Sequence, residues 1–275
     1  MAEHTIQAGD GVTLAASDEG EGTPVVLLHG LTASRRYVVM GSNTLQRAGH
    51  RVVAYDARGH ASSSPAPSPD AYRYEDLTGD LAVVLDALGL ERAVLAGVSM
   101  GAHTCLALAL DTPERVAGLV AITPAFDPVE YLEPERIARW DALSDALRTG
   151  GIEGFAEAFG VQRIPEQWRD TVGRALRQRM AVHERLDALA DALRAVPRSA
   201  PFADLHALEQ IECPVVVVGS RDEADPAHPL EIAERYAELL PRGRLVVENE
   251  GQSPLAWQGG RVSKLIAEVA LEASR

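Results

Sequence analysis

The stretch that decides the fold of this chain is Gly97-Val98-Ser99-Met100-Gly101. It reads Gly-x-Ser-x-Gly, follows the apolar run 93–96 and precedes a helix-like run at 102–110. In a sharp strand-to-helix turn, the serine takes a strained backbone conformation that exposes its hydroxyl. Side chains at the two glycine positions would clash where strand and helix nearly touch. The pentapeptide therefore predicts a nucleophile elbow, with a helix N-terminus behind it that favours negative charge.

The composition of the 275-residue chain limits the classes of protein to which it can belong. This length fits one large α/β domain, or a domain with an insertion. Its 26 basic and 40 acidic side chains give a net charge of −14, which argues against nucleic acid or an anionic membrane as partner. No signal peptide is evident, and no apolar run approaches the roughly 20 residues of a membrane span. With two cysteines in apolar stretches, the sequence predicts a cytoplasmic protein with buried thiols.

Strand patterns and helix patterns alternate through both ends of the chain. A hairpin is expected over 4–19, and further strands over 25–28, 51–55, 93–98, 116–123, 213–219 and 244–248. Helices are expected over 34–48, 75–88, 99–111, 229–240 and 261–273. This alternation predicts a parallel sheet covered on both faces, with the chemistry at the carboxyl ends of the strands.

The alternation is interrupted after Pro124, and residues 125–205 contain no good strand. Helical patterns occur there near 129–149, 151–160, 165–180 and 183–195. We interpret this region as a helical cap that lies over the strand ends and divides the core into 1–124 and 206–275. Its aromatic side chains fit the interior of the cap better than contacts with a ligand.

The order of these motifs resembles that of the α/β-hydrolase fold family along nearly the whole chain. The resemblance is carried by His29-Gly30, Asp56-x-Arg58-Gly59-His60, Gly97-x-Ser99-x-Gly101, the helical insertion and Gly219-x-x-Asp222. It implies an α/β fold with a mostly parallel, eight-stranded sheet flanked by helices, and a helical cap inserted after the sixth strand. These motifs are specific for the fold and not for one reaction, because the fold carries esterases, lipases, peptidases, lyases and inactive receptors.

The resemblance also implies roles for individual residues. Ser99 is the expected nucleophile, and the N–H groups of Leu31 and Met100 are the expected oxyanion hole. Asp222 is the expected acid that orients the base, with Asp225 as the alternative. A serine at the elbow, instead of an aspartate, argues against the usual dehalogenase and epoxide hydrolase chemistry of the family.

A pocket for a small, largely apolar substrate is expected next to the elbow. His29 and Gly30 belong to the expected oxyanion loop, and Trp140 and His206 in the cap region are candidates to line the cleft. No His/Cys cluster has the spacing of metal ligands, and no glycine-rich loop suits a dinucleotide or a phosphate. We therefore expect no metal and no cofactor, and the sequence sets no oligomeric state.

Gln252 stands where the family places its catalytic histidine. The family's loop after the last strand commonly reads Gly-His-Ser, whereas this chain has Gly251-Gln252-Ser253. The last histidine in the chain is His228, so a shifted alignment supplies no replacement. An amide is no useful base at neutral pH, and loss of a triad member leaves only about 10³–10⁴-fold acceleration over water. The predicted triad is therefore incomplete at position 252.

Four other residues are candidates for a displaced base or acid. His228 follows the expected acid by six residues and would reach Ser99 if its loop folds back, whereas a histidine at a helix start is the structural alternative. His103 lies one helical turn after Ser99, where packing beneath the elbow is the favoured interpretation. Glu250 carries a carboxylate that would act as a base if desolvated, although solvated surface charge is its ordinary interpretation. Asp225 stays the alternative to Asp222 as the acid.

Three functions fit these observations. The first is a serine hydrolase of esters or other acyl substrates, with a displaced base or with a triad inactivated by the replacement of His at 252. The second is a lyase, cyclase or isomerase that uses the oxyanion hole without an acyl-enzyme. The third is a non-catalytic binder of a small apolar ligand under the cap. Reaction of Ser99 with a fluorophosphonate distinguishes the first from the third.

Overall fold

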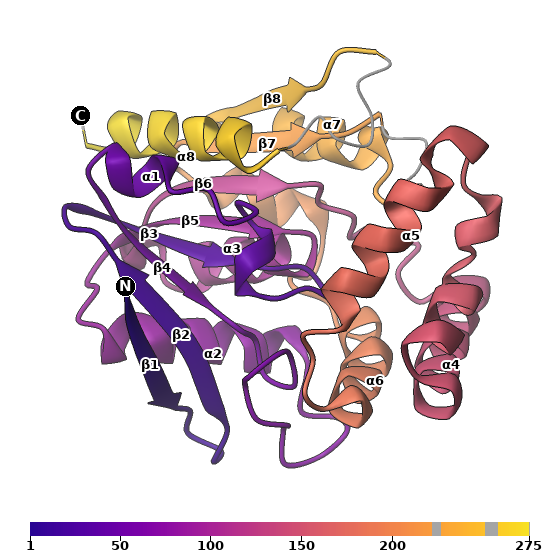
Figure 1. The fold of residues 1–275 in the computed structure, drawn as a ribbon. Helices are drawn as coiled ribbons and strands as arrows, with labels where there is room; N and C mark the ends of the chain where they lie inside the picture. Colours follow the sequence, from indigo (N-terminus) through magenta and orange to yellow (C-terminus); the bar gives the residue numbers. More distant parts are fainter. Residues whose placement is uncertain (222–226, 251–257, 275) are drawn as a thin grey trace.

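The computed structural model, which describes residues 1–221, 227–250 and 258–274, is built on an eight-stranded sheet (Figure 1). The strands are β1 (Ala2–Gln7), β2 (Thr13–Glu19), β3 (Thr23–Leu28), β4 (His50–Tyr55), β5 (Ala93–Val98), β6 (Val116–Ile122), β7 (Val215–Gly219) and β8 (Gly243–Val247). Their order is β1-β2-β4-β3-β5-β6-β7-β8. β2 pairs antiparallel with β1 and with β4, and all other pairs are parallel. The predicted mostly parallel α/β sheet is confirmed.

Helices cover both faces of this sheet (Figure 1). Helices α2 (Tyr74–Ala87), α3 (Met100–Asp111) and α7 (Leu230–Leu239) pack on one face, and α1 (Thr44–Arg47) and α8 (Gly259–Ala273) pack on the other. Alternate residues of one strand serve the two faces: in β3, Val26 and Leu28 face the first group of helices and Val25 and Leu27 face the second. The central strands are continuous apolar runs because both of their faces are buried.

One predicted helix is wrong. The stretch 34–48 does not form a single helix but a 3₁₀ turn, η1 (Arg35–Tyr37), followed by the short α1 (Thr44–Arg47). Between them Met40 and Gly41 have φ values of 49° and 72°, which no right-handed helix accommodates. Ser34, at the start of the expected helix, makes no side-chain hydrogen bond to the first turn.

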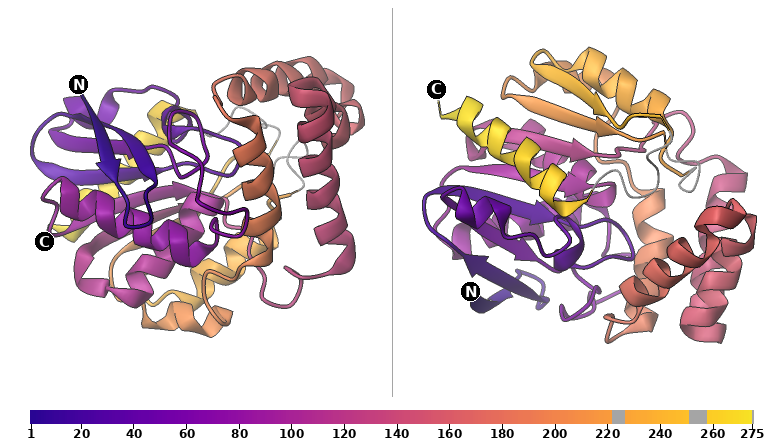
Figure 2. Two further views of the ribbon diagram at one scale, coloured as in Figure 1. Left: turned by 90° about the horizontal axis from the view of Figure 1, so that it is seen from below. Right: turned by 45° about the horizontal axis from the view of Figure 1, so that its top comes forward.

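A helical insertion, residues 123–214, separates β6 from β7. It contains α4 (Pro134–Phe159), α5 (Glu166–Met180) and α6 (Leu186–Ala195), together with the 3₁₀ turns η3 (Val161–Arg163), η4 (Val196–Arg198) and η5 (Leu205–Gln210). The segments expected at 129–149 and 151–160 form one helix with a kink at Gly151, whose φ is 59° and ψ −148°. Figures 1 and 2 show α4, α5 and α6 beyond the carboxyl ends of the parallel strands.

The insertion has an apolar core of its own. Its buried side chains come from all three helices and include Leu143, Leu147, Phe155, Leu176, Met180 and Leu189. Half-buried Trp140 and Leu31 pack against this core, so the insertion contacts the loop that follows β3. Over the described part of the chain, no helix is long and apolar enough to cross a membrane.

Candidate active site

Ser99 occupies the turn between β5 and α3 with a strained backbone. Its φ is 49° and its ψ is −110°, a conformation that residues with a Cβ rarely adopt. The turn is held on both sides, because the Ser99 N–H donates to the Ile122 carbonyl at 2.9 Å and the Ser99 carbonyl accepts from the His103 N–H at 3.1 Å. The predicted strained elbow is confirmed, and Ser99 is half-buried at its tip.

The two glycines of the elbow are required by close backbone contacts. A Cβ on Gly97 would lie 2.2 Å from the carbonyl carbon of Gly101, and a Cβ on Gly101 would lie 2.3 Å from the carbonyl oxygen of Leu28. These distances are far below van der Waals contact, so strand and helix approach as closely as the sequence predicted.

The loop after β3 lies directly against the elbow. A Cβ placed on Gly30 would be 3.6 Å from the Cβ of Ser99. The carbonyl of Gly30 accepts the N–H of Ala33 at 3.0 Å, which closes a four-residue turn. Thr32 within this turn has a φ of 71°, the positive value that a type II turn requires at its third position.

His29 fixes the direction of this turn. Its Nε2 accepts the N–H of Ala57 at 2.9 Å, so its Nδ1 carries the proton and donates to the carbonyl of Gly30 at 2.8 Å. In a planar trans peptide the carbonyl of Gly30 and the N–H of Leu31 point in opposite directions. Holding the first therefore sets the direction of the second.

Two backbone N–H groups at this place have no acceptor in the part of the chain that the structure describes. Among the described residues, neither the N–H of Leu31 nor that of Met100 has a hydrogen-bond acceptor. Met100 is the first residue of α3, where the N–H groups have no acceptor inside the helix. Donors of this kind, at a helix start and on an adjacent loop, suit an oxygen that gains negative charge.

His29 supports the loop from a buried position. Its side chain is 2% exposed, both ring nitrogens contact backbone groups, and the ring borders a small cavity of about 10 Å³ that Met100 also lines. Burial lowers the pKa of His29 and keeps the ring neutral. A neutral ring is what the acceptor role of its Nε2 requires.

His103 is also a buried scaffold residue. Its Nε2 accepts the N–H groups of Ala125 and Phe126, each at 3.1 Å, and its Nδ1 donates to the Tyr74 hydroxyl at 2.9 Å. Burial, and next the charge of His228, lower the pKa of His103 to about 3. With both ring nitrogens occupied, His103 fits the packed interpretation and not that of a displaced base.

Two further buried histidines extend from His29 toward the insertion. The ring centroids of His29 and His60 lie 5.0 Å apart, and those of His60 and His183 lie 5.6 Å apart. The Nδ1 of His60 contacts the carbonyl of Arg58 at 2.9 Å. Burial lowers the pKa of His60 well below 6.5 and lowers that of His183 to about 4. All three rings are therefore neutral at pH 7.

Because these histidines are buried in their neutral form, we expect the protein to lose stability in mild acid. A histidine whose pKa falls on folding stabilises the native state above its unfolded pKa of about 6.5, and this contribution disappears as the pH falls toward the folded value. For His103 and His183 together we expect a loss of about 3 kcal/mol in the free energy of unfolding between pH 6.5 and 5. Urea titrations at pH 5 to 8 measure it, and equal midpoints at pH 5 and 7 would contradict it.

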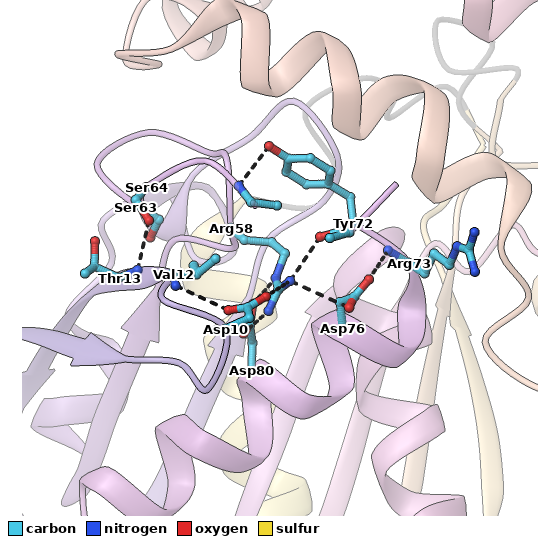
Figure 3. Close-up of polar contacts among 12 residues, drawn as sticks. Asp10, Val12, Thr13, Arg58, Ser63, Ser64, Tyr72, Arg73, Asp76 and Asp80 are labelled. Carbon is cyan, nitrogen blue, oxygen red and sulfur yellow. Dashed lines mark hydrogen bonds and ion pairs between the residues drawn. The ribbon is translucent and has the colours of Figure 1, made fainter. Parts of the chain in front are cut away.

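Arg58 anchors the loop after β4 (Figure 3). The guanidinium is 4% exposed and binds the buried Asp80 of α2 through two hydrogen bonds, of 2.7 and 2.8 Å. It also contacts Asp10 at 2.8 Å and Asp76 at 3.7 Å. Asp10, Asp76 and Asp80 therefore form a structural ion-pair network around Arg58. Over the described residues, no group of three or more His, Cys, Asp and Glu is arranged to hold a metal ion.

Two other expected site residues lie at the surface. The side chain of His206 is 79% exposed and its ring pairs with Glu209 at 2.8 Å, which also raises its pKa. The 3₁₀ turn η5 packs Leu205 and Leu208 inward and leaves this ring in solvent. Glu250 lies on an exposed turn, as its ordinary interpretation predicts. Trp140 is half-buried against the core of the insertion.

The expected acids and the glutamine position, Asp222, Asp225 and Gln252, lie outside the described residues. His228 is described and half-buried, just before α7. The helix α7 that follows it packs on the same face of the sheet as the elbow helix α3.

Glu248 is a residue that the sequence reasoning missed. It follows β8 directly, is 2% exposed, and its Oε1 accepts the Ser220 hydroxyl at 2.9 Å and the N–H of Arg221. It therefore ties the carboxyl end of β8 to that of β7. A charged residue immediately after a buried strand is the signal that would have found it.

A family model and a solved structure both match this chain over most of its length. The family model for the alpha/beta hydrolase fold matches residues 23–259. The solved structure of a thermophilic esterase from Thermogutta terrifontis has 27% sequence identity and a TM-score of 0.79, over 100% of this chain and 99% of that one.

Named relatives extend over most of the chain. A 2-hydroxy-6-oxononadienedioate/2-hydroxy-6-oxononatrienedioate hydrolase of Pseudomonas putida is 29% identical, over 88% of this chain and 85% of its own. A Bacillus subtilis (strain 168) protein is 27% identical over 98% of both chains. It is provisionally named 2-succinyl-6-hydroxy-2,4-cyclohexadiene-1-carboxylate synthase.

Proposed function

The chain belongs to the alpha/beta hydrolase fold family, and on this premise we propose that it is a serine hydrolase of small ester or other acyl substrates. One observation carries the proposal. Ser99 stands in a strained turn next to two backbone N–H groups, of Leu31 and Met100, that no described residue uses. A nucleophile and an anion-binding pair side by side are the parts that acyl transfer needs.

In the proposed reaction the Ser99 hydroxyl oxygen attacks the acyl carbon and loses its proton to a base. The carbonyl oxygen becomes an oxyanion that accepts hydrogen bonds from the N–H groups of Leu31 and Met100. The alcohol leaves with a proton returned by the base, and water then cleaves the acyl-enzyme to release the acid. Asp222 is the proposed acid that orients the base.

We propose His228 as the base, because position 252 carries an amide. The ring nitrogens of His29, His103 and His183 all contact backbone or side-chain groups of the fold, so none of these rings can take the serine proton. His228 is half-buried just before α7. It precedes α7, whose buried residues pack with those of the elbow helix α3 on one face of the sheet, which supports a place near the nucleophile.

The helical insertion is the proposed cap over this site. Leu31 of the loop and Trp140 of α4 both pack against its apolar core. Half-buried apolar groups beside the oxyanion donors support a small, largely apolar substrate.

Hydrolysis of 4-nitrophenyl acetate and butyrate tests the nucleophile and the base. We expect the wild-type chain to exceed the buffer rate, Ser99→Ala to remove the excess, and His228→Ala to lower it by about 10²-fold or more. The matched control is His4→Ala, which removes a histidine of the β1–β2 hairpin that pairs with Asp18. An unchanged rate in Ser99→Ala would contradict the proposed nucleophile, and an unchanged rate in His228→Ala would contradict the proposed base.

A second candidate is a lyase-type reaction at the same site. Two observations favour it: the amide at position 252, and the synthase name of the Bacillus relative that spans 98% of both chains. In that case the N–H groups stabilise an enolate and no acyl-enzyme forms. Failure of both the wild-type chain and Gln252→His to hydrolyse esters would favour this candidate over the hydrolase.

A further inference from the structure

His183, in the connection between α5 and α6, reaches out of the insertion to two loops of the core. Its Nδ1 accepts the N–H of Ala61 at 2.9 Å, and its Nε2 donates to the carbonyl of Thr32 at 3.0 Å. The side chain is buried, with 7% exposure. One imidazole therefore joins the insertion, the loop after β4 and the loop after β3.

Both partners of this imidazole have strained backbones. Thr32 has a φ of 71° and Ala61 a φ of 42°, values in the left-handed region. For a β-branched threonine this conformation is a genuine outlier. Strained residues keep such conformations only where their surroundings fix them, and at these two positions the ring of His183 supplies a contact that does so.

The bond to Thr32 controls a chain of peptide planes. The carbonyl of Thr32 and the N–H of Ala33 belong to one planar peptide and point in opposite directions. The Ala33 N–H donates to the carbonyl of Gly30 at 3.0 Å. The carbonyl of Gly30 shares a peptide with the N–H of Leu31, one of the two unused donors beside Ser99. The Gly30 carbonyl is thus held from two sides, directly by His29 and through the turn by His183, and the position of His183 contributes to the direction of the Leu31 N–H.

We propose that His183 is a positioning residue for the oxyanion hole, through which the helical insertion sets the direction of the Leu31 N–H. The inference rests on the proposed function for its effect on catalysis. Its structural part stands on the contacts alone. In this proposal the insertion does more than cover the site. Its contact with the core loops through His183 orients the Leu31 N–H toward the position of the oxyanion.

Amide hydrogen exchange of the wild-type chain and of His183→Leu tests the structural part. We expect the amide of Ala33 to exchange at least tenfold faster in His183→Leu, because its acceptor turn loses the anchor at Thr32. The matched control is Glu184→Ala, which removes a neighbouring side chain whose partner is the exposed Ser62 and which leaves the backbone bond from Glu184 to Ala61 in place. Unchanged exchange at Ala33 in His183→Leu would overturn the proposal.

Kinetics in a Gln252→His background test the catalytic part. We expect His183→Leu to lower kcat about 10- to 100-fold with KM changed less than threefold, because a misaligned oxyanion donor acts in the transition state. His183→Gln places an amide N–H near the former Nε2 and should keep kcat within about threefold, whereas His183→Asn keeps only an acceptor near Ala61 and should not.

The outcomes of these experiments separate the two proposals. A rise in KM with kcat retained in His183→Leu would overturn the positioning role, as would equal loss in the Gln and Asn variants. If Gln252→His hydrolyses no ester at all, the proposed function fails, and the exchange at Ala33 alone decides whether His183 holds the loop.

Discussion

Gln252→His is expected to raise kcat/KM for short aryl esters by several hundredfold over the wild-type chain. Within the family, the residue at this position takes the proton of the nucleophile and returns it to the leaving group. An amide does neither, and removing a triad member typically leaves about 10³–10⁴-fold acceleration over water. The other proposed parts, Ser99 and the donors of Leu31 and Met100, are already assembled in the structure. His228 is the proposed displaced base of the wild-type chain, and an imidazole at the family's own position should act more effectively than this substitute.

Two variants control this experiment. Gln252→Asn keeps an amide and should leave the rate near that of the wild-type chain. Ser99→Ala combined with Gln252→His should lose the gained activity, because the new imidazole then has no nucleophile to activate. An unchanged ester rate in Gln252→His would rule out a disabled triad at this position, and the absence of ester hydrolysis in both proteins would favour the lyase-type reaction.

Gly101→Ala is expected to destabilise the protein by about 3 kcal/mol or more, through overpacking. The added methyl carbon would lie 2.3 Å from the carbonyl oxygen of Leu28 and 2.8 Å from that of His29. Both are backbone atoms, so the elbow or the oxyanion loop must shift. The free energy of unfolding from urea titration measures the loss, and ester hydrolysis in the Gln252→His background should fall with it.

The same substitution at Gly79 serves as the matched control. Gly79 is exposed within α2, and a Cβ there meets nothing within 4 Å. Because alanine has the higher helix propensity, Gly79→Ala should stabilise by about 0.5–1 kcal/mol. If Gly101→Ala lowers the free energy of unfolding and Gly79→Ala raises it, the loss at position 101 comes from the close backbone approach at the elbow. A Gly101→Ala protein as stable as the wild type would contradict that approach.

The sheet and the elbow could be read from sequence because their signals are local. Central strands such as 25–28 are uninterrupted apolar runs, since both of their faces are buried. The elbow is encoded within five residues, and the required glycines follow directly from backbone contact. The helix expected over 34–48 failed because its apolar residues pack on the sheet from an irregular loop, where tertiary packing overrides helix propensity.

The site was harder to predict from the sequence, because its supporting contacts join residues that are far apart in the chain. His183 binds Thr32 across 151 positions, and no local pattern marks that pair. His103 and His206 are both histidines in helical segments, yet one is buried under the elbow and the other is in solvent. Only packing distinguishes them. The same holds for His29, whose buried ring supports the oxyanion loop from below.

Reaction with a fluorophosphonate, followed by peptide mass mapping, shows whether Ser99 is a nucleophile placed beside an oxyanion hole. We expect a single phosphonyl adduct on the peptide that contains Ser99, formed by the wild-type chain, formed faster by Gln252→His and absent from Ser99→Ala. Absence of any adduct on Ser99 in both the wild-type chain and Gln252→His would contradict the account.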